Sequence, residues 1–363
     1  YKIYKAALLI LATVALSCKK DSLNLIPTND IIAEQVYSSP QGYKQAFAKV
    51  YGAWALVGVK GPTNIVGDLA GLDPAQTDFL RQYWNLQELT SDESSCAWPD
   101  PGIPDAIYGM PEPDNIMIKG LYARSIYQIT LVNEFLREST PEKLSSRNIT
   151  GSAVADINLY RSEARFLRAY QYSVLMDLYG NPPFLTEADE IGKINPKQIK
   201  RVDLFNYVES ELKSIEGELA APMSNEYGRA DRAAAWTVLA HIYLNSEVYL
   251  GAGKGKYTEA ITYAGKVIGA GYTLAANYKN LFLTDNNQTS KEIILTINYD
   301  GFKTQTYGGT TFLINANIDP TMNPASFGVP GGGWSGYRAK STLPLLFGDY
   351  SGSTDKRAMF FGT

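Results

Sequence analysis

The stretch 229–269 constrains the fold more than any other part of the chain. Four of its residues follow the spacing W-x2-L-A-x2-Y, the first half of a tetratricopeptide-type repeat: Trp236, Leu239, Ala240 and Tyr243. On a helix these positions share one face, and the small Ala240 lets a second helix, predicted at 257–268, approach closely. One such hairpin cannot bury its own apolar face, so it predicts neighbouring helices of the same kind.

Apolar residues at helical spacing predict further helices along the chain. They are expected at 38–58, 115–138, 153–179 and 203–219. Ser38 or Ser39, followed by Pro40, begins the first of these helices, and Asp203 caps the last. We therefore expect a mainly α fold in which tetratricopeptide-like hairpins form an α-solenoid-like layer over about 115–270.

Two segments interrupt the helical pattern, at about 58–113 and 298–340. The first is rich in Gly, Pro, Asp and aromatic residues, and the second, rich in Gly, Asn, Thr and aromatic residues, predicts loops or short hairpins. A long irregular segment inside a folded domain is usually functional or disordered, and its tryptophans, such as Trp98, argue against disorder. Residues 292–297 predict a buried strand.

Residues 1–17 have the pattern of a signal peptide. A basic start precedes an apolar run from Ala6 to Leu16, which is too short to span a bilayer. Because Cys18 follows directly, we expect a lipidated Cys18, a tether at 18–28 and a folded domain at 29–363. Ordinary secretion, with Cys18 near a cleavage site, is the competing interpretation. The helical pattern stops without a terminal cap helix, so we expect the C-terminal part of the domain to be absent.

The composition argues against several classes of function. The net charge is −4 and no basic run exists, which argues against a nucleic-acid partner. The chain has a single histidine, His241, which argues against a histidine-based zinc site and against a Ser-His-Asp triad. Cys18 and Cys96 are too few for a disulfide framework, and no phosphate-binding loop is found. The sequence therefore predicts neither a metal nor a cofactor.

The residues alone leave two kinds of chemistry open in the irregular segments. A glycosidase could use two carboxylates held about 5 to 9 Å apart. The first segment offers Asp68, Asp73, Asp78, Glu88, Asp92 and Glu93. Loop aromatics beside charged groups favour sugar binding instead, because a sugar stacks its C–H face on a ring and pairs its hydroxyls with carboxylate or guanidinium. The same rings could also anchor long loops to the core.

Several motifs in a fixed order carry a family resemblance. They are E-A-R-F-L-R-A at 163–169, L-Y-G at 178–180, G-R-A-D-R-A-A at 228–234 and Y-K-N-L-F at 278–282. Together with Cys18 they resemble the SusD/RagB family of surface glycan-binding lipoproteins of Bacteroidetes, over nearly the whole chain. Asp300-Gly301 and the run Y-G-G-T-T at 307–311 are similar to the starch-binding member of that family.

The resemblance implies tetratricopeptide-like helices packed against an irregular, loop-rich ligand-binding face with a few short strands. It implies a non-enzymatic protein that is lipid-anchored at the outer membrane, exposed on the cell surface, and delivers starch-type α-glucan to a SusC-like TonB-dependent transporter. By position, the implied ligand-binding residues are Asp73, Arg81, Trp98, Tyr307 and Trp334, and Asp100 is added to them as a neighbour of a position that departs from the pattern.

Two positions depart from the pattern of the starch-binding member. Cys96 stands where that member has a tryptophan, and Pro101 stands where it has an asparagine, for which Asp100 is a candidate substitute. These departures keep a different glycan open as the ligand. A glycosidase and a peptide-binding repeat adaptor also stay open as hypotheses.

Overall fold

The computed structural model describes residues 32–58, 66–110, 112–189, 192, 195–304 and 306–360. The predicted signal peptide, Cys18 and the tether therefore lie outside the described residues. Within the described ranges, no helix is both long enough and apolar enough to cross a membrane.

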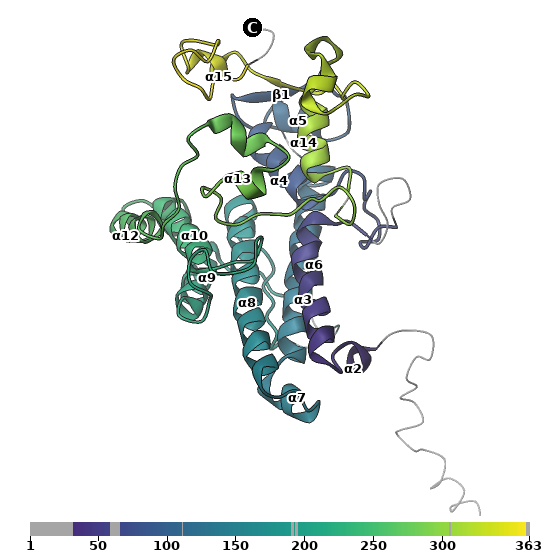
Figure 1. Ribbon diagram of the computed structural model, residues 1–363, viewed down its shortest axis with the longest axis vertical. Helices are drawn as coiled ribbons and strands as arrows, with labels where there is room; N and C mark the ends of the chain where they lie inside the picture. Colours follow the sequence, from purple (N-terminus) through teal and green to yellow (C-terminus); the bar gives the residue numbers. More distant parts are fainter. Residues whose placement is uncertain are drawn as a thin grey trace, which may run out of the picture.

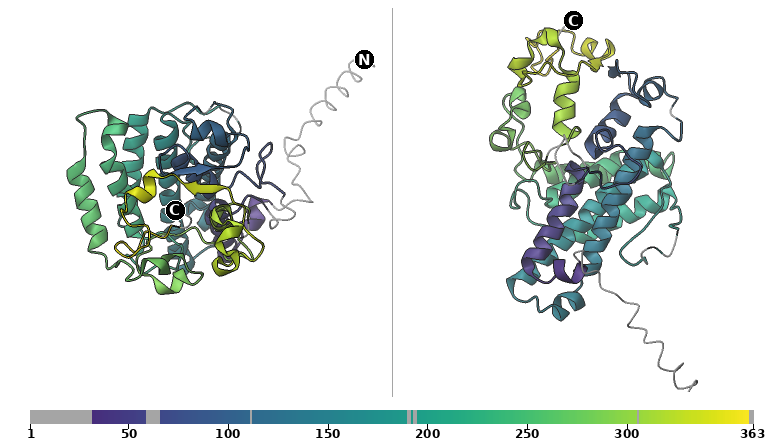
Figure 2. Two further views of the ribbon diagram at one scale, coloured as in Figure 1. Left: turned by 90° about the horizontal axis from the view of Figure 1, so that it is seen from above. Right: turned by 90° about the vertical axis from the view of Figure 1, so that its right-hand side faces the viewer.

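Long helices packed in chain order form the body of the molecule (Figures 1 and 2). They are α3 (Pro40–Ala55), α6 (Ile116–Glu138), α8 (Ser152–Tyr179), α9 (Arg201–Ile215), α10 (Arg232–Leu244) and α12 (Tyr257–Ile268). Each packs against the next along this series. Shorter helices precede or connect them: α2 (Ala33–Val36), α7 (Pro141–Ser146) and α11 (Ser246–Leu250). The predicted mainly α fold with a layer of helical hairpins is confirmed.

Local capping explains where most predicted helices begin. Ser39 caps α3 through its side chain, and Pro40 occupies the first position, as predicted. The prediction that Asp203 caps the helix at 203–219 is wrong, because this residue lies in the first turn of α9. The helix starts at Arg201, whose N–H donates a hydrogen bond of 2.7 Å to the side-chain oxygen of Asn181 just after the end of α8, so that one free N–H of the first turn is satisfied.

The hairpin of α10 and α12 packs as its motif predicts. Leu239 and Tyr243 are fully buried, whereas Trp236 lies at the edge of the core and donates its Nε1 hydrogen to Glu216 at 2.8 Å. The connection after α11 begins at Gly251, whose φ of 101° is readily adopted only by glycine.

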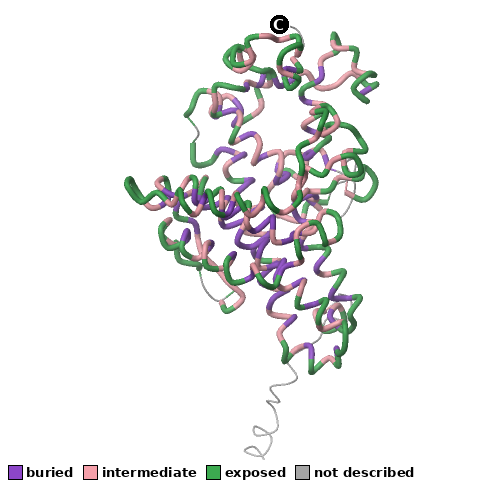
Figure 3. The backbone as a smooth tube through the Cα atoms, turned by 60° about the vertical axis from the view of Figure 1, so that its left-hand side comes forward, coloured by how far each residue is buried: buried purple, intermediate pink, exposed green. Residues whose placement is uncertain are grey.

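Burial is concentrated in the long helices (Figure 3). The buried residues include charged ones. Glu163, in the E-A-R-F-L-R-A run, is fully buried in α8 and forms an ion pair with Arg229. It also accepts hydrogen bonds from Tyr51 at 2.7 Å and Asn225 at 3.2 Å. The motif therefore joins α3, α8 and the segment before α10, and its role is in the scaffold.

The two segments predicted as irregular contain helices. The first includes α4 (Phe79–Glu88) and α5 (Ile103–Ile107), and the second includes α14 (Gly309–Asn317), η3 (Pro320–Met322) and η4 (Pro324–Phe327). α15 (Thr342–Leu345) follows. Helix α4 forms because Asp78 accepts a hydrogen bond from the N–H of Arg81 at 3.0 Å, a capping signal inside an otherwise loop-like composition.

The strand predicted at 292–297 is wrong. This segment, which follows η2 (Tyr278–Phe282) and α13 (Asn286–Thr289), joins no sheet in the described structure. Its apolar residues Ile294, Leu295 and Ile297 pack against the helical core instead, so burial explains the pattern without strand pairing.

The described sheet has two short strands, β1 (Ser94–Cys96) and β2 (Tyr337–Ala339). They pair antiparallel, with Cys96 opposite Tyr337, and so join the two segments predicted as irregular. Behind them lies a small second core that includes Leu89, Phe312 and Tyr337. The few short strands that the family resemblance implies are thus present.

Candidate functional site

A shallow cavity of about 340 Å³ opens where the segments 58–113 and 298–340 meet. We call it the aromatic cavity, and its lining consists of Ala75, Gln76, Arg81, Trp98, Asp100, Tyr307 and Trp334. Five of the six predicted ligand-binding residues therefore line one cavity: Arg81, Trp98, Asp100, Tyr307 and Trp334.

Three aromatic rings follow one another along the aromatic cavity. The ring centroids of Trp98 and Trp334 are 6.4 Å apart, with 48° between the ring planes. Those of Trp334 and Tyr307 are also 6.4 Å apart, with 52° between the planes. Because each ring is tilted by about half a right angle to its neighbour, the three present a bent surface. Ring faces of this kind stack on the apolar faces of a ligand.

Main-chain contacts hold Trp98 and Trp334 together. Trp98 Nε1 donates a hydrogen bond of 3.1 Å to the carbonyl of Trp334, and the N–H of Ala97 donates to the carbonyl of Gly336 at 2.9 Å. The N–H of Trp334 donates at 2.7 Å to the carbonyl of Asn315 in α14. Gly336 lies so close to Trp98 that a Cβ would be 2.3 Å from the indole. Strand pairing and α14 therefore set the spacing of the two rings.

Arg81 and Asp100 supply opposite charges to the same cavity. Helix α4 places the Arg81 guanidinium 4.5 Å from the centre of the Phe312 ring, and its Nη1 donates to the carbonyl of Ala75 at 3.1 Å. Burial lowers the pKa of Arg81, and its Nε has no hydrogen-bond partner in the described structure. Asp100 is the carboxylate among the lining residues. The pair can donate to and accept from ligand hydroxyls.

Asp73 does not line the aromatic cavity. Its Oδ1 accepts a hydrogen bond of 2.9 Å from the N–H of Ala75, and its carbonyl accepts one of 2.7 Å from the hydroxyl of Thr77. Asp73 thus shapes the turn that carries the wall residues Ala75 and Gln76. Direct ligand contact by Asp73 stays a prediction.

Two of the carboxylates considered for a glycosidase have structural roles away from the aromatic cavity. Asp68 pairs with Arg124, and Asp78 is fully buried at the start of α4. Among the residues that line the aromatic cavity, Asp100 therefore has no second carboxylate facing it. In the described part of the chain, no three His, Cys, Asp or Glu side chains are grouped to hold a metal ion.

Known proteins resemble this chain both in sequence and in fold, although no family model matches the sequence. The chain is 37% identical over 267 residues to the starch-binding protein SusD of Bacteroides thetaiotaomicron, a match that covers 72% of this chain and 46% of that protein. Solved structures of the SusD superfamily share the fold. The chain belongs to the SusD-like family.

Two solved structures illustrate the shared fold. A SusD-like carbohydrate-binding protein of Bacteroides fragilis superposes with a TM-score of 0.62 at 18% identity, over 86% of this chain and 53% of that one. The surface glycan-binding protein A of Bacteroides thetaiotaomicron, in complex with laminarihexaose, gives a TM-score of 0.60 at 18% identity, over 84% of this chain and 60% of that one. The chain spans less than half the length of SusD itself.

The two sequence departures have different structural settings in this SusD-like chain. Cys96 is buried in β1 within the second core, where burial raises the pKa of its thiol, and it does not line the aromatic cavity. Trp98 alone therefore supplies the ring at this end. Pro101 is also absent from the lining, whereas Asp100 is present.

The sequence offered Asp78 only as a possible glycosidase carboxylate, whereas in the structure it joins the two halves of the site. Its Oδ1 accepts hydrogen bonds from the N–H of Arg81 at 3.0 Å and of Gly309 at 3.1 Å, so it links α4 to α14. Burial raises the pKa of Asp78 to about 6. Its position before Phe79 was the helix-capping signal that could have revealed it.

Proposed function

We propose that this SusD-like chain binds starch-type α-glucan oligosaccharides at the aromatic cavity without cleaving them. The observation that carries the proposal is the bent surface of Trp98, Trp334 and Tyr307. A helical glucan turns as it runs, so its successive sugars fit rings that are tilted to one another. Arg81 and Asp100 at the same cavity suit hydroxyl groups. The match to a protein named as starch-binding, over 72% of the chain, supports the same ligand class.

The proposal extends to the place of the protein in the cell. Residues 1–17 are a signal peptide in this proposal, and 18–28 are a tether from a lipid on Cys18 to the folded domain. The lipid holds the domain at the outer membrane, exposed on the cell surface. There the chain delivers captured oligosaccharide to a SusC-like TonB-dependent transporter. The lipoprotein-like Cys18 and the family relationship support this arrangement.

Affinity electrophoresis through gels that contain starch, laminarin, pectin, xylan or fructan tests the ligand. Starch is expected to retard the protein most. Trp334→Ala removes one ring face from the cavity. Burying a whole large side chain contributes roughly 1.5–3 kcal/mol, and one face contributes roughly half of that, so binding should weaken about 3- to 12-fold. Tyr257→Ala, an exposed aromatic on α12, is the control. Unchanged retardation of Trp334→Ala would show that the site is misplaced.

Two further outcomes would point to a different glycan or to catalysis. Stronger retardation by another glycan would change the substrate and leave the binding class intact. Incubation with maltooligosaccharides, followed by measurement of new reducing ends, tests the absence of catalysis. Sustained turnover that is lost in Asp100→Asn would establish a glycosidase instead.

A further inference from the structure

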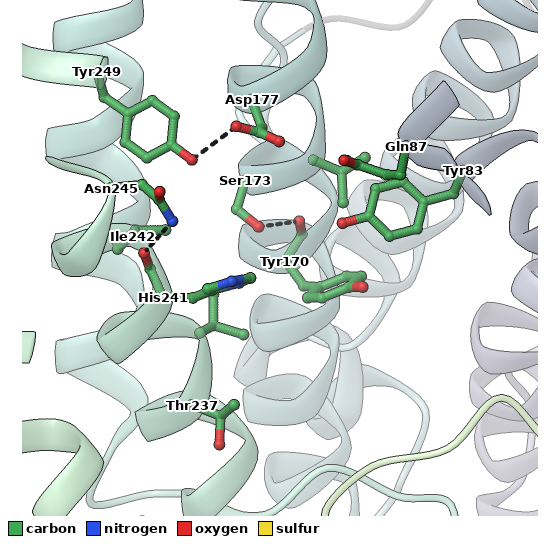
Figure 4. A pocket seen from close by; sticks show the side chains of 12 residues that line it. Tyr83, Gln87, Tyr170, Ser173, Asp177, Thr237, His241, Ile242, Asn245 and Tyr249 are labelled. Carbon is green, nitrogen blue, oxygen red and sulfur yellow. Dashed lines mark hydrogen bonds between the residues drawn. The ribbon is translucent and has the colours of Figure 1, made fainter. Parts of the chain in front are cut away.

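A second cavity of about 530 Å³ lies between α4, α8, α10 and α11 (Figure 4). It shares no lining residue with the aromatic cavity. It contains His241, the single histidine of the chain, which the proposed glucan site does not use. Its volume is within the roughly 300–1,000 Å³ that small-molecule sites usually have.

Three tyrosine rings in the second cavity are held from behind by rings of the core. The pairs are Tyr83 stacked on Phe79 at 5.8 Å, Tyr170 edge-on to Trp54 at 5.2 Å, and Tyr249 beside Phe205 at 6.2 Å. The three tyrosines come from three different helices, α4, α8 and α11. Since each ring is supported, a ligand would meet surfaces that are already in place and lose little free energy in ordering them.

Polar groups in the second cavity have unused hydrogen-bonding capacity. Within the described structure, the side chains of Tyr83, Tyr170, Gln87 and His241 make no hydrogen bond. Figure 4 shows Tyr83 and Gln87 on one side of α8 and His241 on the other. Burial raises the pKa of Tyr83 and of Tyr170, so both phenols stay neutral donors. Asp177 accepts a hydrogen bond of 2.9 Å from Tyr249 with one oxygen only.

This set of groups selects a class of ligand. No Lys or Arg lines the second cavity, so an anion would find no opposite charge. Its carboxylate, Asp177, is shared with Tyr249, which weakens the case for a cation. Phenol, amide and imidazole groups both donate and accept, as hydroxyl groups do, and the ring faces suit C–H surfaces. We propose that the second cavity binds a neutral saccharide of one or two sugar units.

Helix α4 connects this site to the aromatic cavity. Arg81 lines the aromatic cavity, whereas Tyr83 and Gln87 line the second cavity. Both sites are therefore held in fixed relation by one helix. A chain with two saccharide sites would hold a branched or long glycan more tightly than either site alone. The second site does not depend on the ligand proposed for the first.

Isothermal titration calorimetry with maltose, cellobiose and laminaribiose tests the proposal in a chain whose aromatic cavity is disabled. The background variant is Tyr307→Ala/Trp334→Ala. At least one disaccharide is expected to bind to it still. Adding Gln87→Ala and His241→Ala should weaken that binding about tenfold or more. Both side chains are exposed and unbonded, so an unchanged denaturation midpoint should accompany the loss. Leu244→Ala, exposed on α10 outside the cavity, is the matched control.

Three results would overturn the proposal. The background variant could bind none of the three disaccharides, or it could bind them equally well with and without Gln87 and His241. It could also bind tetramethylammonium in place of sugars, which would identify the second cavity as a cation site. None of these results bears on the aromatic cavity, whose own test is retardation by starch.

Discussion

Substitution of Gly336 by alanine is the sharpest test of how the aromatic cavity is built. A Cβ at this position would lie 2.3 Å and 2.4 Å from two atoms of the Trp98 indole, against at least 3.4 Å for an ordinary contact. The ring must therefore move by about 1 Å, and overpacking of this kind typically costs about 1–3 kcal/mol. The same movement would stretch the 3.1 Å hydrogen bond from Trp98 to the carbonyl of Trp334.

Two measurements follow from the Gly336→Ala substitution. Denaturant unfolding should show a free energy of unfolding lowered by about 1–3 kcal/mol, and affinity electrophoresis should show weaker retardation by starch. Gly331→Ala is the matched control, because it lies in the same loop with open space around the new Cβ and should change neither quantity. If Gly336→Ala behaves like Gly331→Ala in both assays, the Trp98 ring does not pack where we describe it.

Three further predictions concern buried charges. Burial raises the pKa of Asp78 to about 6, against 3.8 for an ordinary Asp carboxyl. Between these two pH values the folded state binds more protons than the unfolded state. The free energy of unfolding should therefore fall by up to about 3 kcal/mol as the pH rises from 4 to 7. Asp78→Asn should flatten that slope, and an equally steep slope would contradict the assignment. Asp68→Ala should lower the free energy of unfolding in urea by about 3–5 kcal/mol, because it leaves the buried Arg124 without its ion-pair partner. Adding Arg124→Met should restore part of that free energy. Glu163→Ala should lower the free energy of unfolding by a similar amount, because it leaves Arg229 without its ion-pair partner. Neither residue lines the aromatic cavity, so the glycan affinity of the folded protein, measured by calorimetry, should not change.

Most of the helical scaffold could be predicted from the sequence. Helices α3, α6 and α8 match their predictions to within a few residues, since apolar spacing and the cap at Ser39 are local signals. Helices α4 and α14 were not predicted, because they lie in segments whose glycine, proline and aromatic content is typical of loops. Both begin where Asp78 supplies a hydrogen bond, α4 through Arg81 and α14 through Gly309, and the second of these contacts joins residues far apart in sequence.

The sequence by itself determined the candidate ligand-binding residues and most of the long scaffold helices. Trp98, Arg81 and Trp334 were identified as separate positions by their type and by family resemblance. Only the tertiary structure decided that they share a cavity. Their proximity depends on the pairing of β1 with β2 and on the hydrogen bond from the N–H of Trp334 to α14. The tertiary structure also shows that Asp73 does not line the cavity and that Cys96 is buried in the second core. Helix formation depends on neighbours a few residues away, whereas the cavity depends on contacts between distant segments, which no local pattern encodes.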